Sequence, residues 1–274
     1  MRMSKIVVPF IALQCAWFAT SSWAAEEVAA QAGDAPAQAC EGFGPQTPRD
    51  IDSKEGVNPR SFSLAPHYSA MNLCNIHFHN NAEHKAKAFS IFSGEGDSAG
   101  YQCNISQSLS ESERQKPKAD ICNGLQSGDT VEVHWVHSSC DVAPGKGLGS
   151  CLSPSCANPD LRVETQVFTL VNDDSALDFN DFAYQGNVVD GYHQAKALPT
   201  KTGKPVEFTG STSGPSYTEQ VCSPLQVSWS VRPKCAKLDI NSLGKWCENN
   251  AFEEDHAHGV RKLVVNPELL SEIE

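Results

Sequence analysis

The sequence predicts one β-dominated domain, rich in disulfides, with only short peripheral helices. Apolar residues occur in short runs of β-branched and aromatic side chains, separated by Gly, Pro, Ser and Asn, which is typical of strands and turns. The length of 274 residues suits a single all-β core, so a second domain is not required. The chain also contains 11 cysteines, which predict cross-links if it enters an oxidising compartment.

The first 24 residues have the features of a secretory signal peptide. Arg2 and Lys5 precede an apolar run from Ile6 to Phe18, and the small residues up to Ala24 suit a signal peptidase. The apolar run is too short to span a membrane. We therefore expect a secreted or periplasmic protein with no membrane span.

Residues 25–39 are Ala-rich and nearly free of large apolar side chains, so we expect a flexible lead-in before a single domain at residues 40–274. Removal of the signal takes Cys15 away and leaves ten cysteines, which predict up to five disulfides. No two of them have the C-x-x-C spacing typical of thiolate metal sites and redox motifs. The spacing leaves the pairing open, including the partner of Cys74.

The mature chain is expected to be strongly acidic. The signal contains two of the 21 basic residues and none of the 33 acidic ones, so 19 basic and 33 acidic residues remain, a formal charge of −14. Such a surface repels nucleic acid and anionic lipid. We expect a small, uncharged or weakly charged substrate and no nucleic-acid partner, and the sequence leaves the oligomeric state open.

Five runs have the length and composition of strands: Asn75–His79, Ala88–Phe92, Thr130–His137, Val163–Val171 and Leu225–Val231. Between Cys140 and Pro159, abundant Gly, Pro and Ser with two further cysteines predict a disulfide-stapled surface loop. The clearest helix candidate is Pro267–Ile273, with Asn266 as its cap and Pro267 in its first turn.

The first of these strands carries two imidazoles on one face. His77 and His79 are separated by one residue, so both project from the same side of the strand as Asn75. An H-x-H pair by itself is often an ordinary strand feature. It becomes a candidate metal site if a neighbouring strand adds a third imidazole.

The strand at 130–137 can supply that imidazole. Glu132 and His134 share one face, whereas His137 points to the other and is expected to be a buried structural histidine. Three neutral imidazoles with a fourth position left open are typical of a catalytic zinc site. Asn75 and Glu132 are placed to accept hydrogen bonds from the ring nitrogens that do not bind the metal.

Two further histidine motifs have more ordinary interpretations. Glu83-His84 closely follows the first strand, where a solvated turn is the default. His256 and His258 form a second H-x-H pair in an acidic run without a strand pattern, so we expect a solvated tail segment there.

Together these motifs resemble the carbonic anhydrases. The stretches that carry the resemblance follow in the order of the alpha class: Q-T-P-R-D-I at 46–51, H-F-H at 77–79, E-H at 83–84, E-V-H-W-V-H at 132–137, F-T-G-S-T-S-G-P at 208–215 and C-S-P-L-Q-V-S-W-S-V at 222–231. The ten cysteines and the short interval between His79 and Glu83 fit the delta class and its bacterial relatives better. The resemblance covers residues 40–274.

The resemblance implies a twisted, mostly antiparallel central sheet and a zinc lyase. In such an enzyme, hydroxide on Zn²⁺ attacks carbon dioxide in an apolar pocket, and bicarbonate and a proton leave. The residues that carry over are the ligands His77, His79 and His134, the orienting residues Asn75 and Glu132, and the pocket residues Val136, Val227 and Trp229.

Two further roles follow from the resemblance. Glu83 matches the glutamate that accepts a hydrogen bond from a hydroxyl beside the zinc, and Ser213 matches that hydroxyl, or Thr212 if the loop slips by one residue. No motif places a proton shuttle, for which His67 and His193 are candidates.

Two other functions fit the same sequence. A non-catalytic zinc-binding protein of this fold would explain why Thr212 and Gly214 depart from the family pattern. A disulfide-rich binding module without metal would explain the cysteine content and leave the histidines structural.

Overall fold

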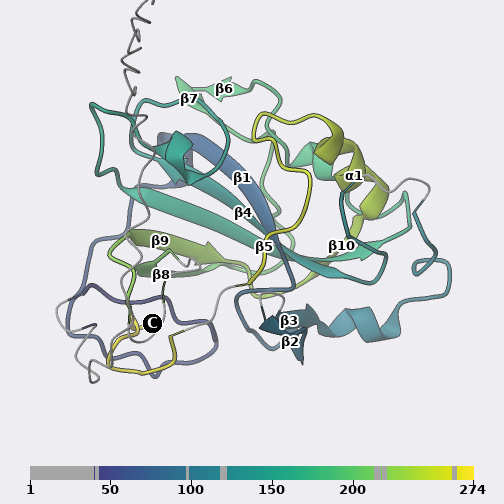
Figure 1. Ribbon diagram of the computed structural model, residues 1–274, viewed down its shortest axis with the longest axis horizontal. Coiled ribbons are helices and arrows are strands. Elements are labelled where there is room, and N and C mark those ends of the chain that lie inside the picture. Colours follow the sequence, from purple (N-terminus) through teal and green to yellow (C-terminus); the bar gives the residue numbers. More distant parts are fainter. Residues whose placement is uncertain are drawn as a thin grey trace, which may run out of the picture. The chain divides into compact units, whose positions relative to one another are not determined.

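The structure is a computed structural model that describes residues 40, 43–96, 99–117, 122–212, 217, 221–260 and 264–274 (Figure 1). The predicted signal peptide and lead-in, at 1–24 and 25–39, lie outside these residues. The described part belongs to one compact unit, Pro36–Glu274. In that part, none of the helices has the length and apolar character needed to cross a membrane.

A mixed sheet forms the centre of this unit (Figure 1). Its strands lie in the order β1 (Asn72–Asn80), β4 (Thr130–Ser138), β5 (Leu161–Val171), β9 (Gln226–Val231) and β8 (Val206–Ser211), and β10 (Ala236–Asp239) also pairs with β5. The pairs β1–β4, β4–β5 and β8–β9 are antiparallel, whereas β5 pairs in parallel with β9 and β10. The prediction of a β-dominated, mostly antiparallel sheet is confirmed, with two parallel pairings within it.

The remaining elements are short. Two small antiparallel sheets pair β2 (Phe89–Ser93) with β3 (Gly100–Cys103) and β6 (Val188–Val189) with β7 (Tyr192–His193). The 3-10 helices are η1 (Tyr68–Ala70), η3 (Asn104–Ser108), η4 (Leu148–Cys151) and η5 (Phe179–Asp181), and the α-helix is α1 (Ile240–Glu248). Short peripheral helices were therefore predicted correctly as a class.

The position of the helix was predicted wrongly. Pro267 begins only a turn, and Leu270 forms a parallel bridge with Gln46, whose backbone N–H donates to the carbonyl of Leu269 at 2.7 Å. These long-range backbone hydrogen bonds replace the local ones of a helix. The α-helix forms instead at Ile240, where the side chain of Asp239 accepts from the N–H of Asn241 and caps it.

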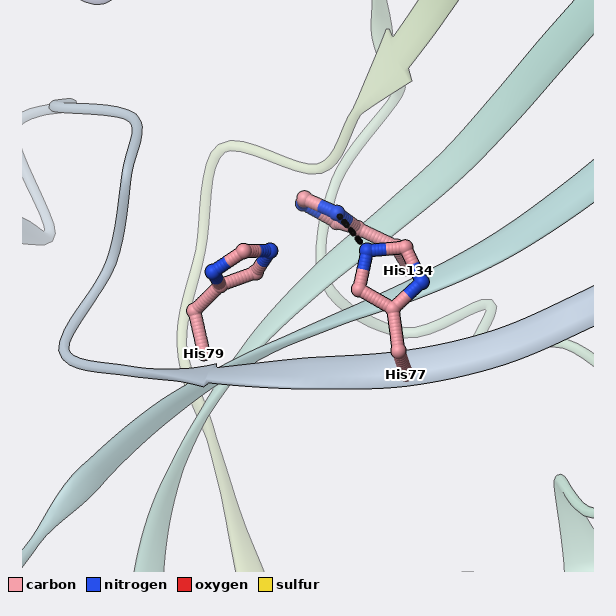
Figure 2. Close-up of side chains that lie close together, drawn as sticks. All are labelled: His77, His79 and His134. Carbon is pink, nitrogen blue, oxygen red and sulfur yellow. Dashed lines mark hydrogen bonds between the residues drawn. The ribbon is translucent and has the colours of Figure 1, made fainter. Parts of the chain in front are cut away.

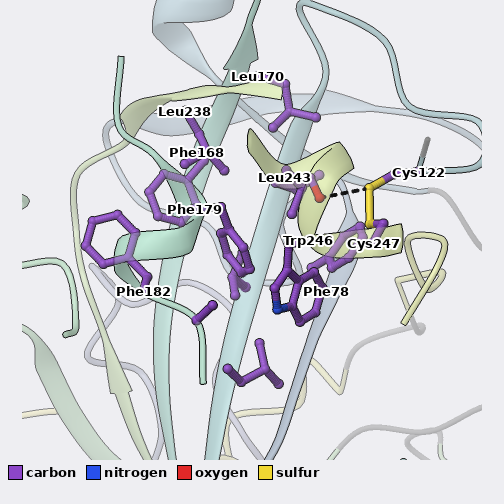
Figure 3. Close-up of a cluster of buried hydrophobic side chains, with 14 of the residues drawn as sticks. Phe78, Cys122, Phe168, Leu170, Phe179, Phe182, Leu238, Leu243, Trp246 and Cys247 are labelled. Carbon is purple, nitrogen blue, oxygen red and sulfur yellow. Dashed lines mark hydrogen bonds between the residues drawn. A yellow bond between two sulfur atoms is a disulfide. The ribbon is translucent and has the colours of Figure 1, made fainter. Parts of the chain in front are cut away.

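One face of the sheet carries the main apolar core (Figure 3). Ile76 and Phe78 of β1 pack there beside Trp135 of β4, and α1 covers this face with Leu243 and Trp246. The opposite face of β1 and β4 carries His77, His79 and His134. Burial of large apolar side chains on the core face thus fixes the positions of β1 and β4, the two strands that carry these histidines on their other face.

Five disulfides cross-link the unit: Cys40–Cys222, Cys74–Cys151, Cys103–Cys235, Cys122–Cys247 and Cys140–Cys156. They use all ten cysteines outside the predicted signal, as expected. Four of them close loops of 77 to 182 residues. In the loop-entropy model, each of these four raises the free energy of the unfolded chain by about 4–5 kcal/mol. Such bridges indicate an oxidising environment.

Candidate metal centre

The two histidine-bearing strands are neighbours in the sheet. β1 and β4 pair antiparallel, and their register places His77 directly opposite His134. His79 lies two residues further along β1 on the same face, so the three imidazoles converge (Figure 2). One nitrogen from each ring lies within 4.8 Å of the other two. Strands that are far apart in the sequence therefore assemble one cluster.

The second ring nitrogen of each β1 histidine is bound to an acceptor. His77 Nδ1 donates to Oδ1 of Asn75 at 2.7 Å, and His79 Nδ1 donates to the backbone carbonyl of Gly259 at 2.9 Å. Because the proton of each neutral imidazole is held on Nδ1, the unprotonated Nε2 directs its lone pair toward the cluster. Asn75 lies on the same face of β1 as the two histidines, as the alternation of side chains predicted. The Gly259 carbonyl is a backbone group, so no pattern of side chains could predict it.

On β4 the orienting hydrogen bond uses the other nitrogen. His134 Nε2 donates to Oε1 of Glu132 at 2.7 Å, so Nδ1 faces the cluster, 3.2 Å from Nε2 of His77. The same Oε1 accepts from His84 Nδ1 at 2.6 Å. His84, Glu132 and His134 also have metal-binding spacing, but hydrogen bonds join their facing atoms. This second set therefore orients His134 and does not compete with the first for a metal.

His84 lies in the interior and not in a solvated turn. Its side chain is fully buried and packs edge-on against Trp229, with ring centroids 4.9 Å apart. The expectation of a solvated turn at Glu83-His84 is wrong because this segment folds over β4, where His84 reaches the Glu132 carboxylate. Burial by itself would raise the pKa of Glu132, but His84 and His134 hold it well below its usual range.

Both β1 histidines are neutral near pH 7. Burial lowers the pKa of His77 well below its ordinary value, and the neighbouring imidazoles of His134, His79 and His258 lower it further. Burial also lowers the pKa of His79, although the Glu83 carboxylate opposes this change. The neutral imidazole is the form that binds a metal ion.

Glu83 places a carboxylate next to the cluster. Its side chain is 1% exposed, with Oε2 3.4 Å from Nη1 of Arg49 and Oε1 3.7 Å from Nδ1 of His79. Burial alone would raise its pKa, but His79 and Arg49 lower it to about 2. Glu83 is therefore an ionised acceptor held inside the protein.

A cavity of roughly 270 Å³ opens beside the three imidazoles. Its apolar side is formed by Val136, Leu148, Leu161, Val163, Val227 and Trp229. The three residues assigned to a pocket wall by resemblance all lie on this side. Glu83 and Thr212 also line the cavity, whereas Ser213 lies outside the described residues.

His258 belongs to this cavity, although its sequence context indicated a solvated tail. The segment around it pairs with the end of β1: His258 N–H donates to the carbonyl of Phe78, and Asn80 N–H donates to the carbonyl of His258, both at 2.8 Å. Its ring lies against those of His77 and His79 and bonds through Nε2 to Glu254 at 2.8 Å. The solvated-tail prediction is wrong for His258 because edge pairing needs no alternating pattern.

The other surface histidines stay away from the cavity. His256 is largely exposed and pairs with Asp255, as expected for a solvated segment. Neither candidate for a proton shuttle lines the cavity: His67 Nδ1 lies 2.9 Å from Oγ of Ser69, and His193 Nδ1 lies 2.9 Å from the hydroxyl of Tyr184.

The donor set fits a borderline-soft divalent metal. Three imidazole nitrogens converge, each ring is held by a hydrogen bond through its other nitrogen, and the cluster opens on one side to a cavity. These are the ligand type, outer contacts and open position of a catalytic zinc site. No thiolate or carboxylate among the converging atoms would reduce the charge of the ion.

Comparison with known families agrees with this arrangement. The family model described as delta carbonic anhydrase matches residues 68–242, more than half of the chain. This chain belongs to the delta carbonic anhydrase family. An alpha-carbonic anhydrase from Thermovibrio ammonificans, solved with the inhibitor sulfanilamide, is similar over 84% of this chain and 86% of that chain, with 14% identity and a TM-score of 0.33. That likeness is too distant to bear on the site, and no curated protein matches the sequence.

Membership of the carbonic anhydrases supports the hydration of carbon dioxide in general terms and implies a lyase. In this family member, sequence reasoning missed the contributions of Arg49, His84, Gly259 and His258. A signal existed for Arg49, which lies within the Q-T-P-R-D-I stretch that resembles the family. The Gly259 carbonyl and His258 reach the site only through pairing of the C-terminal segment with β1.

Proposed function

We propose that this protein hydrates carbon dioxide reversibly to bicarbonate and a proton, with Zn²⁺ held by His77, His79 and His134. The observation that carries the proposal is the convergence of three imidazole nitrogens whose rings are each oriented by a different acceptor. A Zn²⁺ ion held there would lower the pKa of a water molecule and so supply a nucleophile near neutral pH.

The orienting acceptors have a defined task in this proposal. Asn75, the Gly259 carbonyl and Glu132 hold one proton on each ring at the nitrogen that faces away from the metal. The unprotonated nitrogen of each ring therefore directs its lone pair at one common position, and the rings need not reorient when the metal binds. Glu132 is the charged member of the set, and its carboxylate strengthens the hydrogen bond that orients the His134 ring.

The apolar side of the cavity suits the substrate. Carbon dioxide is small and uncharged, so burial against Val136, Val227 and Trp229 costs it little and excludes competing water. Bicarbonate is charged and loses solvation on the same surface, which favours its release. The wall therefore discriminates between substrate and product by charge.

Glu83 is proposed to orient a hydroxyl next to the reacting oxygen. The ionised carboxylate accepts a hydrogen bond from that hydroxyl, which leaves the hydroxyl oxygen as an acceptor for the proton on the nucleophile. Ser213 is the proposed partner, and Thr212, which lines the cavity, is the alternative. Ser213→Ala and Thr212→Ala distinguish them, because only the true partner lowers the hydration rate while zinc content stays normal.

Stopped-flow hydration of carbon dioxide tests the proposal. The zinc-loaded wild-type protein is expected to be active. In His134→Ala the hydration rate should fall by more than the roughly 10–100-fold expected when a residue that only orients a ligand is removed. His256→Ala, which removes an exposed imidazole of the other H-x-H pair, is the matched control and should keep full activity. Activity that survives in His134→Ala would exclude this mechanism. Stoichiometric zinc without hydration would show a non-catalytic zinc-binding protein, and protein purified without metal would favour the binding module.

We further propose that the chain is secreted or periplasmic, that residues 1–24 are removed on export, and that the mature domain begins after a lead-in at 25–39. The five disulfides support an oxidising compartment. N-terminal sequencing of protein recovered from its native compartment should begin at Ala25. An intact Met1 would exclude the cleavage.

A further inference from the structure

A β-bulge next to the histidine pair redirects one cysteine of β1. The register pairs Leu73 with His137 and Asn75 with Val136, so Cys74 is an extra residue between two successive pairs. Leu73 accordingly packs with the main core, whereas Cys74 turns to the opposite side and packs in the cluster of Val136 beside the cavity. Bulges commonly re-aim a side chain in this way.

The redirected cysteine is joined to the loop that borders the cavity. Cys74 forms a disulfide with Cys151 at the end of η4, and both side chains are fully buried. Gly147 and Leu148, which lie just before Cys151, line the cavity. The bridge therefore fastens the cavity loop to β1 immediately before Asn75.

Hydrogen bonds extend this attachment to the Asn75 side chain. The carbonyl of Cys74 accepts from the Gly145 N–H at 3.0 Å and from the Ser150 hydroxyl at 2.8 Å. The Gly145 carbonyl in turn accepts from Nδ2 of Asn75 at 3.1 Å. Because the amide nitrogen is directed at Gly145, the amide oxygen must face His77, where it accepts from Nδ1 at 2.7 Å.

We propose that the Cys74–Cys151 disulfide is a positioning element for the metal site, acting through Gly145 and Asn75 on the orientation of His77. The inference rests on the proposed metal site. It adds that the Cys74–Cys151 disulfide affects metal affinity, whereas Cys122–Cys247 lies in the core on the opposite face of the sheet and should not. The loop holds the Asn75 amide in one orientation, and so holds the lone pair of His77 Nε2 toward the other two ligands.

Metal affinity of the whole folded chain tests this proposal. Co²⁺ titration followed by visible absorption, and Zn²⁺ competition with a chelator, are compared for wild type and the double variant Cys74→Ser/Cys151→Ser. We expect binding to weaken by roughly 10-fold, the lower end of the range for groups that orient metal ligands. The matched control is Cys122→Ser/Cys247→Ser, which removes another long-range bridge in the core on the opposite face of the sheet. Its metal affinity should stay within about twofold of wild type.

A double-mutant cycle separates positioning from general loosening. In an Asn75→Ala background the amide link is gone, so loss of the disulfide should have little further effect on metal affinity. Equal losses in both backgrounds, or a loss as large in the control, would overturn the proposal. If the double cysteine variant does not fold, Ser150→Ala keeps every disulfide and removes the hydroxyl that contacts the carbonyls of Cys74, at 2.8 Å, and Gly147, at 2.7 Å. It should weaken metal binding in the same direction, and unchanged binding would overturn the proposal.

These outcomes are distinct from failure of the proposed function. Wild-type protein that binds Co²⁺ but does not hydrate carbon dioxide would refute the function and leave the positioning effect measurable. Wild-type protein that is active but whose metal affinity is insensitive to the disulfide would refute the positioning effect alone.

Discussion

The two faces of the strand pair β1–β4 are built on opposite principles. On one face His77 lies opposite His134 (Figure 2) beside a cavity, and on the other Ile76 lies opposite Trp135 inside the main core. The core face is stabilised by burial of apolar surface, which needs no partner group. The histidine face holds buried polar rings that would each cost free energy without their acceptors.

The difference shows how one pair of strands separates stability from chemistry. Removing a side chain from the core face should lower the free energy of unfolding without altering the site in the molecules that remain folded. Removing an acceptor from the histidine face should weaken metal binding with a smaller effect on folding. Each prediction below tests one side of that separation.

The largest effect is expected from Trp135→Ala on the core face. Trp135 is 1% exposed and its indole N–H donates to the carbonyl of Phe182 at 2.8 Å. Its loss leaves a cavity and an unpaired carbonyl, so the free energy of unfolding should fall by about 3–5 kcal/mol in urea titrations. The hydration rate per folded, zinc-loaded molecule should change little. A variant with normal stability and a disabled site would contradict the separation of the two faces.

A smaller effect is expected from Glu132→Gln on the histidine face. Glu132 accepts from both His134 and His84, and its charge stabilises their N–H donors. The amide keeps the shape but loses the charge, so Zn²⁺ affinity measured against a chelator should fall by about 10- to 100-fold, or about 1.4–2.7 kcal/mol. Glu253→Gln, at a largely exposed carboxylate paired with Lys146, is the control and should leave the affinity unchanged. Equal affinities for wild type and Glu132→Gln would show that this carboxylate does not support the metal site.

The third prediction concerns a histidine on the core face. Burial lowers the pKa of His137 to about 3, and the nearby Arg162 and His67 act in the same direction while the carbonyl of Trp135 opposes it. The unfolded residue titrates near 6.5, so the unfolded chain binds more protons between about pH 6.5 and pH 3. This histidine therefore reduces stability as pH falls through that window, by about 2 kcal/mol between pH 7 and pH 5.

His137→Gln should lose this part of the pH dependence. Urea unfolding of metal-free wild type and variant at pH 7, 6 and 5 measures it as the difference between two slopes, so a uniform loss of stability in the variant does not interfere. Parallel slopes would show that the pKa of His137 is the same in the folded and the unfolded chain, and would contradict the prediction.

The sequence by itself determined which residues share a face. Alternation along a strand put Asn75, His77 and His79 together and placed His137 away from His134, because side-chain direction depends only on the local backbone. The even number of cysteines outside the predicted signal likewise predicted up to five disulfides, and the structure has five. The metal-ligand roles inferred from these patterns stay predictions until a metal is measured.

Only the tertiary structure decided what those faces meet. Strand order made His134 the neighbour of His77, and pairing of the C-terminal segment with β1 brought in Gly259 and His258. The bulge at Cys74, the burial of His84 and the turn in place of the Pro267 helix also depend on contacts with distant segments. Such contacts join backbone groups or packed side chains of segments that are far apart in the sequence. They leave no periodic pattern in the local sequence, so the local sequence does not predict them.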